Sequence, residues 1–472
     1  MKRQTEYKYV NASIKAIVEF KEKKTFTISS KTEYINEVPI DIWFSENKFQ
    51  FRINCVEFLN FEAIYKNIDN IFNTEIIKNG DLKYTFLKYT SDNIKIGLAS
   101  QVIEGELNSI IQDDLKSFDG NNLRFLIPFN SNENIGVIEN YKSLETDQDI
   151  TYGVGYNELL IMGFKFHVCK ISIENISYLM IDLFDNCEIK LADKIIDSLL
   201  ISFSYLFGTD FRSDCFILSS LDIGFQRIDR IAFYARQKNY GHRSPIYNSH
   251  EIRNLGFSEN YFQLSPKVLT TFCEKLNSDK QFLRAIEIYI EATQNKYSLS
   301  RCILYSTCIE TIIGLVKLKE ATNPIELERY KNSDISSQFH HIVEESKYLT
   351  RDDKEFLIIR KLPYLNSPTN PDKIELSISN FNIQLPDKFK KALKYRNQYL
   401  HGSIPKGNLV GSVNTDNSIR ASELQFLVNI IILKMVGYKG YIKNYSAEIE
   451  YNARKEQNTD NLQLNHPLYY EI

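Results

Sequence analysis

The 472-residue chain lacks the features that mark several protein classes. Its formal net charge is −3, so it has no strong basic excess with which to coat long nucleic acids, and any contact with RNA must be local. Its seven cysteines are odd in number and form no CxxC pair, which argues against a disulfide framework or a zinc ribbon. We interpret them as small core residues. Glycine (18) and proline (11) are scarce, which predicts short loops.

Long apolar runs are also missing. The two longest, Ile195–Gly208 and Val428–Val436, fall short of the roughly 18–20 residues that cross a bilayer. The N-terminal residues do not form the apolar segment of a secretory signal. The sequence therefore predicts a cytoplasmic protein that does not enter a membrane.

The first half of the chain has the pattern of a β-rich domain. Short β-branched and aromatic runs are broken by Asn, Asp, Gly and Ser, which predicts a sandwich or barrel-like sheet over residues 1–260. One helix interrupts this pattern near 192–206, where apolar residues take helical spacing. The expected strands are Ile14–Phe20, Thr25–Ser29, Phe49–Cys55, Lys83–Tyr89, Ile94–Ala99, Leu123–Pro128, Leu159–Ile171, Tyr178–Leu183, Cys215–Leu218 and Arg230–Tyr234.

The second half has helical spacing of its apolar residues, which predicts a four- to six-helix bundle. We therefore expect an α+β multidomain protein, with a β-rich domain over 1–260, an all-α domain over 261–445 and a C-terminal tail over 446–472. The expected helices are Lys280–Thr293, Ser300–Leu318, Ser336–Tyr348, Arg351–Leu362, Pro386–Leu400 and Ser422–Gly437.

One short segment, KYRNQYLHG over Lys394–Gly402, combines residue types that suit RNA chemistry. Arg396 and His401 are five residues apart near the end of an expected helix that Gly402 can terminate. An arginine offers a charged fork for phosphate, and a histidine can move a proton. Cleavage of RNA by its own 2′-hydroxyl needs those two functions and no metal ion. On spacing alone, an exposed helix end is the more common explanation for such a pair, and the setting of the segment is what favours catalysis.

Other residues join this segment as candidates with two interpretations each. Glu310 lies in an apolar stretch of an expected helix, where it either orients Arg396 or His401, or serves as a structural or exposed carboxylate. The basic and aromatic residues before the motif either bind RNA or form a solvated helix face. They are Lys388, Lys390, Lys391, Lys394 and Tyr395. His341 and Glu345 lack the further ligands of a metal site, so we expect no metal.

Taken together, these features resemble the HEPN superfamily of ribonucleases, and its ApeA-like branch in particular. The likeness rests on an R-x4-H motif formed by Arg396 and His401, followed after the Arg by polar Asn397. It extends to the helices around Leu304–Leu315 and Asn429–Tyr441 and covers roughly residues 265–445. A β-rich domain ahead of such helices is also similar to ApeA organisation.

The resemblance implies a metal-independent endoribonuclease that acts as a toxin in abortive infection against phage. Arg396 would stabilise the phosphoryl transition state, His401 would transfer the proton, and Asn397 would orient the pair or bind substrate. The products would carry 2′,3′-cyclic phosphate and 5′-hydroxyl ends. A homodimer or larger homo-oligomer with no cofactor is expected, held latent until a phage-derived trigger acts on the N-terminal domain.

Two alternatives remain open. The first is a non-catalytic HEPN module, in which the helices dimerise and the β-rich domain recognises a ligand. The second, ranked lower because the chain is long and shows no partner-enzyme motif, is an antitoxin-like scaffold. The sequence does not choose among transfer, messenger and ribosomal RNA as substrate, because each exposes unpaired loops.

Overall fold

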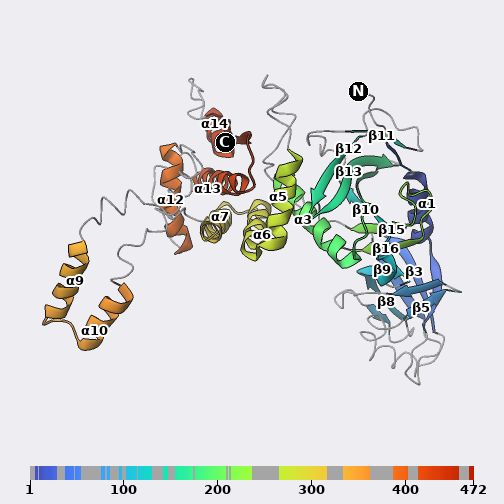
Figure 1. The fold of residues 1–472 in the computed structure, drawn as a ribbon, viewed down its shortest axis with the longest axis horizontal. Helices are drawn as coiled ribbons and strands as arrows, with labels where there is room; N and C mark the ends of the chain where they lie inside the picture. The colour runs from blue at the N-terminus through green and yellow to red at the C-terminus, as the bar shows by residue number, and fades with distance from the viewer. Residues whose placement is uncertain are drawn as a thin grey trace. The chain divides into compact units, whose positions relative to one another are not determined.

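The computed structural model divides the chain into two compact units, Met1–Lys280 and Gln281–Ile472 (Figure 1). An antiparallel sheet dominates the first and helices dominate the second, which confirms the expected α+β class. The structure describes residues 6–8, 10–28, 38–46, 48–54, 76–79, 82–85, 95–97, 102–113, 115–129, 142–146, 155–173, 176–208, 211, 214–235, 265–315, 333–361, 386–401, 413–456 and 467–472.

The first unit is built on a sixteen-stranded sheet whose pairs are antiparallel apart from the parallel pair β1–β11. Most expected strands are present, with ends that shift by a few residues. The prediction of one strand over Leu159–Ile171 was wrong, because the chain turns at Met162 and Gly163, both with positive φ, and forms two antiparallel strands there. In spatial order the strands are β1 (Glu6–Lys8), β11 (Lys142–Thr146), β12 (Gly155–Ile161), β13 (Phe164–Ile173), β14 (Ile176–Leu183), β10 (Asn122–Phe129), β15 (Cys215–Ser220), β16 (Arg230–Tyr234), β9 (Ser109–Gln112), β6 (Leu82–Thr85), β5 (Ile76–Asn79), β2 (Lys24–Ile28), β3 (Val38–Ser45), β4 (Lys48–Asn54), β8 (Val102–Leu107) and β7 (Lys95–Gly97).

Part of this sheet closes on itself. Strands β8 and β9 are consecutive in the chain, with only Asn108 between them. The pairing that leaves β9 passes through β6, β5, β2, β3 and β4 and reaches β8. The strand pairing therefore returns to the continuous segment β8–β9 from which it started, and this closed set of strands is a ring of pairings. Strand β7 on one side and the strands from β16 to β1 on the other extend beyond it.

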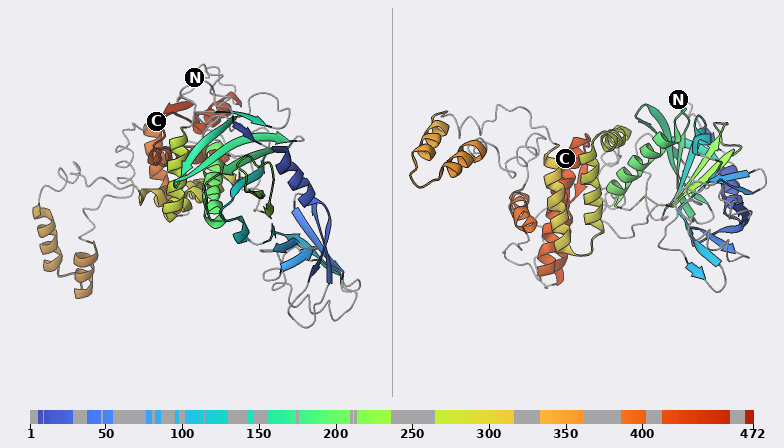
Figure 2. Two further views of the ribbon diagram at one scale, coloured as in Figure 1. Left: turned by 45° about the vertical axis from the view of Figure 1, so that its right-hand side comes forward. Right: turned by 90° about the horizontal axis from the view of Figure 1, so that it is seen from below.

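Helices lie on both faces of the larger part of the sheet. Helix α1 (Val10–Lys21) and helix α3 (Ile189–Phe207) lie on opposite faces, as the two views of Figure 2 show. The prediction of a strand over Ile14–Phe20 was wrong. The apolar residues there are spaced so that one helical face is buried, at Val10, Ile17 and Phe20. The α1 face of the core also contains Leu126, Tyr156, Cys169, Met180, Phe216 and Phe233.

The boundary between the units lies beyond the predicted position at 260/261 because another helix belongs to the first unit. Helix α5 (Pro266–Ser278) packs against α3 and β12. The rings of Tyr205 and Phe272 lie 5.3 Å apart, and the amide of Asn277 donates to the Ser198 hydroxyl at 2.7 Å. These contacts fix α5 to the sheet-bearing unit.

A fully buried ion pair crosses the sheet between β10 and β14. Arg124 lies directly opposite Asp182 in the register, and both side chains are completely buried. The guanidinium donates from Nε and Nη2 to the two carboxylate oxygens at 2.7 and 3.0 Å, and from Nη1 to the hydroxyl of Ser13 at 2.8 Å. The guanidinium carbon also lies 4.1 Å from the centre of the Phe225 ring. The pair therefore ties two strands to α1.

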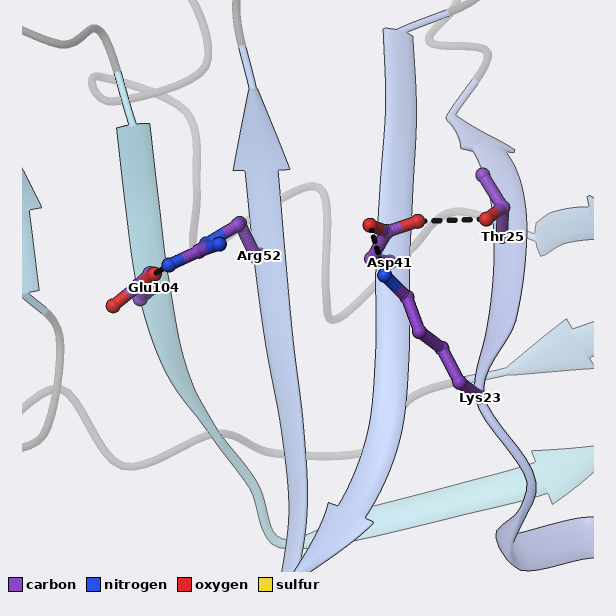
Figure 3. Close-up of polar contacts among 5 residues, drawn as sticks. All are labelled: Lys23, Thr25, Asp41, Arg52 and Glu104. Carbon is purple, nitrogen blue, oxygen red and sulfur yellow. Dashed lines mark hydrogen bonds and ion pairs between the residues drawn. The ribbon is translucent and has the colours of Figure 1, made fainter.

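The outward side of the closed part of the sheet is polar instead. Asp41 accepts a hydrogen bond from Thr25 at 2.7 Å and pairs with Lys23 at 2.9 Å, and Arg52 pairs with Glu104 on the next strand (Figure 3). The Thr25 hydrogen bond, followed by that of Lys23, lowers the pKa of the Asp41 carboxyl. Exposed pairs of this kind contribute about 0–1 kcal/mol each, so they mark the solvent side more than they hold the fold.

The second unit is helical over most of its described length. Its last residues are not the tail expected over 446–472, because α14 packs along α13 and β17 pairs with β18. Helix α13 also starts well before the predicted Ser422. The elements are α6 (Lys280–Gln294), α7 (Ser298–Ile313), α9 (Ser333–Glu345), α10 (Arg351–Glu355), the π-helical turn η4 (Phe356–Lys361), α12 (Asp387–Leu400), α13 (Val413–Met435), β17 (Tyr441–Lys443), α14 (Tyr445–Glu456) and β18 (Tyr469–Glu471).

Two expectations from composition can be compared with the described residues. Every cysteine among them is free and buried, which confirms the core interpretation there, while Cys55 lies outside the described residues. Within the described parts of the chain, we find no helix with both the length and the apolar character required to cross a membrane.

Candidate functional site

Helix α12 carries the motif and has two distinct faces. Pro386 precedes it, Asp387 lies in its first turn, and its buried side chains recur at helical spacing. The buried stripe consists of Phe389, Ala392, Leu393, Arg396 and Tyr399. The exposed stripe consists of Asp387, Lys390, Lys391, Lys394 and Gln398, and it continues to His401 in the turn after the helix.

Arg396 lies on the buried stripe, and its partner is the second predicted carboxylate. Its side chain is 0% exposed, and Nη2 lies 2.9 Å from Oε1 of Glu310 on α7. Glu310 remains 32% exposed, so the carboxylate lies at the solvent boundary and the guanidinium lies beneath it. Burial lowers the pKa of the Arg396 guanidinium, and Glu310 opposes that shift. The two residues thus join α7 to α12.

His401 lies apart from Arg396. Five residues along an α-helix correspond to a rotation of about 140° beyond a full turn. The imidazole is accordingly exposed, on the side of α12 that carries the lysines. The structure therefore does not bring the two motif residues together on one face. Asn397 lies within α12, and its side chain is outside the described part of the structure.

The expected basic patch separates into two groups. Lys390, Lys391 and Lys394 are exposed and lie on the stripe that ends at His401. Lys388 instead points toward α14, where its ammonium donates to the Ser446 hydroxyl at 3.0 Å. Burial lowers the pKa of Lys388. A short cationic stripe thus leads along α12 to an exposed histidine.

The first turns of α13 form a polar cluster that the sequence did not suggest. Helices α12 and α13 run antiparallel, with Tyr395 opposite Arg420 and Tyr399 opposite Asn417. The Arg420 guanidinium lies 4.5 Å from the centre of the Tyr395 ring and 2.8 Å from the Asp416 carboxylate. The Tyr399 hydroxyl donates to Asn417 at 3.3 Å. These contacts fix the last turn of α12 just before His401.

Glu423 lies one turn further along α13. Burial raises the pKa of its carboxyl to about 7, while the charges of Lys388 and Arg420 act in the opposite direction. The start of α13 was predicted at Ser422, so Asp416 and Arg420 were not assigned to a helix. Their i, i+4 spacing is the signal that could have revealed the ion pair.

The described residues contain no group of three or more histidine, cysteine, aspartate or glutamate side chains placed to hold a metal ion. Comparison of the chain with protein-family models, with curated proteins and with solved structures finds no match.

Proposed function

We propose that the helical unit is a HEPN-type, metal-independent endoribonuclease that uses the α12 motif. The observation that carries the proposal is the exposed stripe of α12, on which Lys390, Lys391 and Lys394 lead to His401. Lysines along one face attract the phosphates of an RNA strand. An exposed histidine at the end of that stripe is placed to exchange a proton with a bound nucleotide.

The chemistry that fits these groups is transesterification. The 2′-oxygen loses its proton and bonds to phosphorus, and the bond from phosphorus to the 5′-oxygen breaks as that oxygen is protonated. His401 transfers the proton at one of these oxygens. Because Arg396 and His401 lie on different faces of α12 in this structure, activation must bring the Arg396 guanidinium to the same phosphate. There it supplies positive charge to the phosphoryl oxygens, and Asn397 orients the pair. The ends produced are a 2′,3′-cyclic phosphate and a 5′-hydroxyl.

The cellular role in the proposal is that of a cytoplasmic, ApeA-like effector of abortive infection. It acts as a homodimer that is latent until a phage-derived trigger acts on the sheet-bearing unit. The burial of Arg396 beneath Glu310 supports latency, because a fully buried guanidinium cannot reach a phosphate in solvent.

The same burial also favours a second candidate, a non-catalytic module in which Glu310 and Arg396 are a structural bridge between α7 and α12. The nuclease and the non-catalytic module predict different results in cells when the motif residues are changed. RNA is compared from cells that express the wild type, His401→Ala or Arg396→Ala/His401→Ala during phage challenge. The nuclease predicts growth arrest and RNA fragments with the wild type alone. Equal fragmentation with the double variant would leave the non-catalytic module as the better account.

A further inference from the structure

Glu310 and Arg396 form a layered ion pair at the junction of α7 and α12. The guanidinium is 0% exposed and the carboxylate is 32% exposed, so solvent meets the anion before it meets the cation. An arginine fork binds carboxylate and phosphate with the same planar geometry. An anion that approaches Arg396 from solvent must therefore take the place that the Glu310 carboxylate now holds.

We propose that Arg396 is the base of a phosphate-binding site that Glu310 fills in the resting protein. Displacement of the carboxylate by an RNA phosphate would convert the internal ion pair into a contact with substrate. Glu310 is then an inhibitory group in the proposed nuclease, and not the residue that orients Arg396. This inference rests on the proposed function for its consequence, but the phosphate site can be tested without any RNA cleavage.

One feature of α7 supports this assignment. Thr307 lies one turn before Glu310, and Thr311 follows it directly. The hydroxyls of Thr307 and Thr311 donate to backbone carbonyls of α7 itself, at 3.0 and 2.9 Å respectively. They leave the local surface polar without adding a second anion.

The test is amide hydrogen exchange of the full-length protein, read from peptides of α7 and α12, in inorganic phosphate and in chloride at equal ionic strength. Glu310→Gln keeps the size of the side chain and removes its charge, which leaves Arg396 buried without that counter-charge. We expect faster exchange in chloride for this variant. Phosphate at about ten times its dissociation constant should slow that exchange about tenfold. The wild type, whose site is filled, should respond far less.

Two controls keep the result specific. Glu310→Gln/Arg396→Gln removes the cation as well, and its exchange should not respond to phosphate. Glu448→Gln removes the carboxylate that lies 3.1 Å from the buried Lys443 ammonium, a similar ion pair on other elements, and should leave α7 and α12 unchanged. A phosphate response of equal size in the wild type and Glu310→Gln, or none in Glu310→Gln, would overturn the inference.

RNA cleavage separates this inference from the proposed function. If both hold, Glu310→Gln fragments RNA without phage challenge, and Glu310→Gln/His401→Ala does not. A phosphate response with no fragmentation by Glu310→Gln under phage challenge would keep the anion site and remove the nuclease. Fragmentation that falls in Glu310→Gln, with folding intact, would return Glu310 to an orienting role and contradict the inhibitory one.

Discussion

Removal of one charge from the buried pair between β10 and β14 should unfold the first unit far more readily than the same change at the surface. Asp182→Asn keeps the shape of the side chain but removes the negative charge that pairs with the fully buried Arg124 guanidinium. Losing one partner of a buried ion pair costs about 3–5 kcal/mol. The matched control is Asp41→Asn in the exposed contacts of Figure 3, for which we expect about 0–1 kcal/mol.

The chain offers a selective probe for this experiment. Trp43 is its only tryptophan and lies in β3 of the first unit, so its fluorescence during urea unfolding reports that unit. The double variant Arg124→Met/Asp182→Leu should recover most of the loss, because apolar side chains of similar size replace a buried ion pair at little net cost. Equal unfolding free energies for Asp182→Asn and Asp41→Asn would refute the reasoning, since burial would then add nothing to the pair.

Three further predictions concern the helical unit. The folded protein keeps the Glu423 proton up to about pH 7, whereas the unfolded chain loses it near the usual 4.5. Wild-type stability from this group therefore falls as pH rises through that window. Glu423→Gln should raise the melting temperature above pH 7 and change it little below pH 4.5. Phe389 is fully buried and stacks on Phe426, with the ring centres 4.5 Å apart. Phe389→Ala should lower the unfolding free energy of the protein by about 3–5 kcal/mol, measured by chemical denaturation followed by circular dichroism. Lys391→Gln/Lys394→Gln should weaken binding of single-stranded RNA by His401→Ala protein and reduce the slope of log affinity against log salt by about 1.4, measured by fluorescence anisotropy. An unchanged slope would place the RNA elsewhere.

Much of the fold was predictable from local patterns, and the failures have physical causes. Helix α3 follows from the spacing of its apolar residues. The run Leu159–Ile171 was predicted as one strand but forms the hairpin β12–β13, because the turn at Met162 and Gly163 interrupts an otherwise continuous β pattern. The region of α1 was mistaken for a strand because its β-branched residues suit either structure, and packing against the sheet decided between them. A barrel-like sheet was one of the two expected forms, but the order of its strands could not be predicted, because it depends on contacts between strands that are distant in the chain.

The candidate site was also predictable only in part. The motif helix and the presence of Glu310 on another helix were predictable, and the contact between Glu310 and Arg396 was one of the alternatives considered. The burial of Arg396 was not predictable, because a sequence motif does not show which face of its helix packs against a neighbouring helix. In β10, a single arginine within an apolar strand was the signal for the Arg124–Asp182 pair, but its partner is set by strand register alone.

The measurement that tests the central claim most directly is the sequencing of RNA ends that carry a 5′-hydroxyl, during phage challenge. Cells express the wild type, His401→Ala or His341→Ala. His341 is an exposed histidine on α9, and its variant is the control. The nuclease proposal predicts that new 5′-hydroxyl ends appear with the wild type and His341→Ala and are absent with His401→Ala. The same ends in all three, with each protein folded and expressed, would contradict a catalytic role for His401.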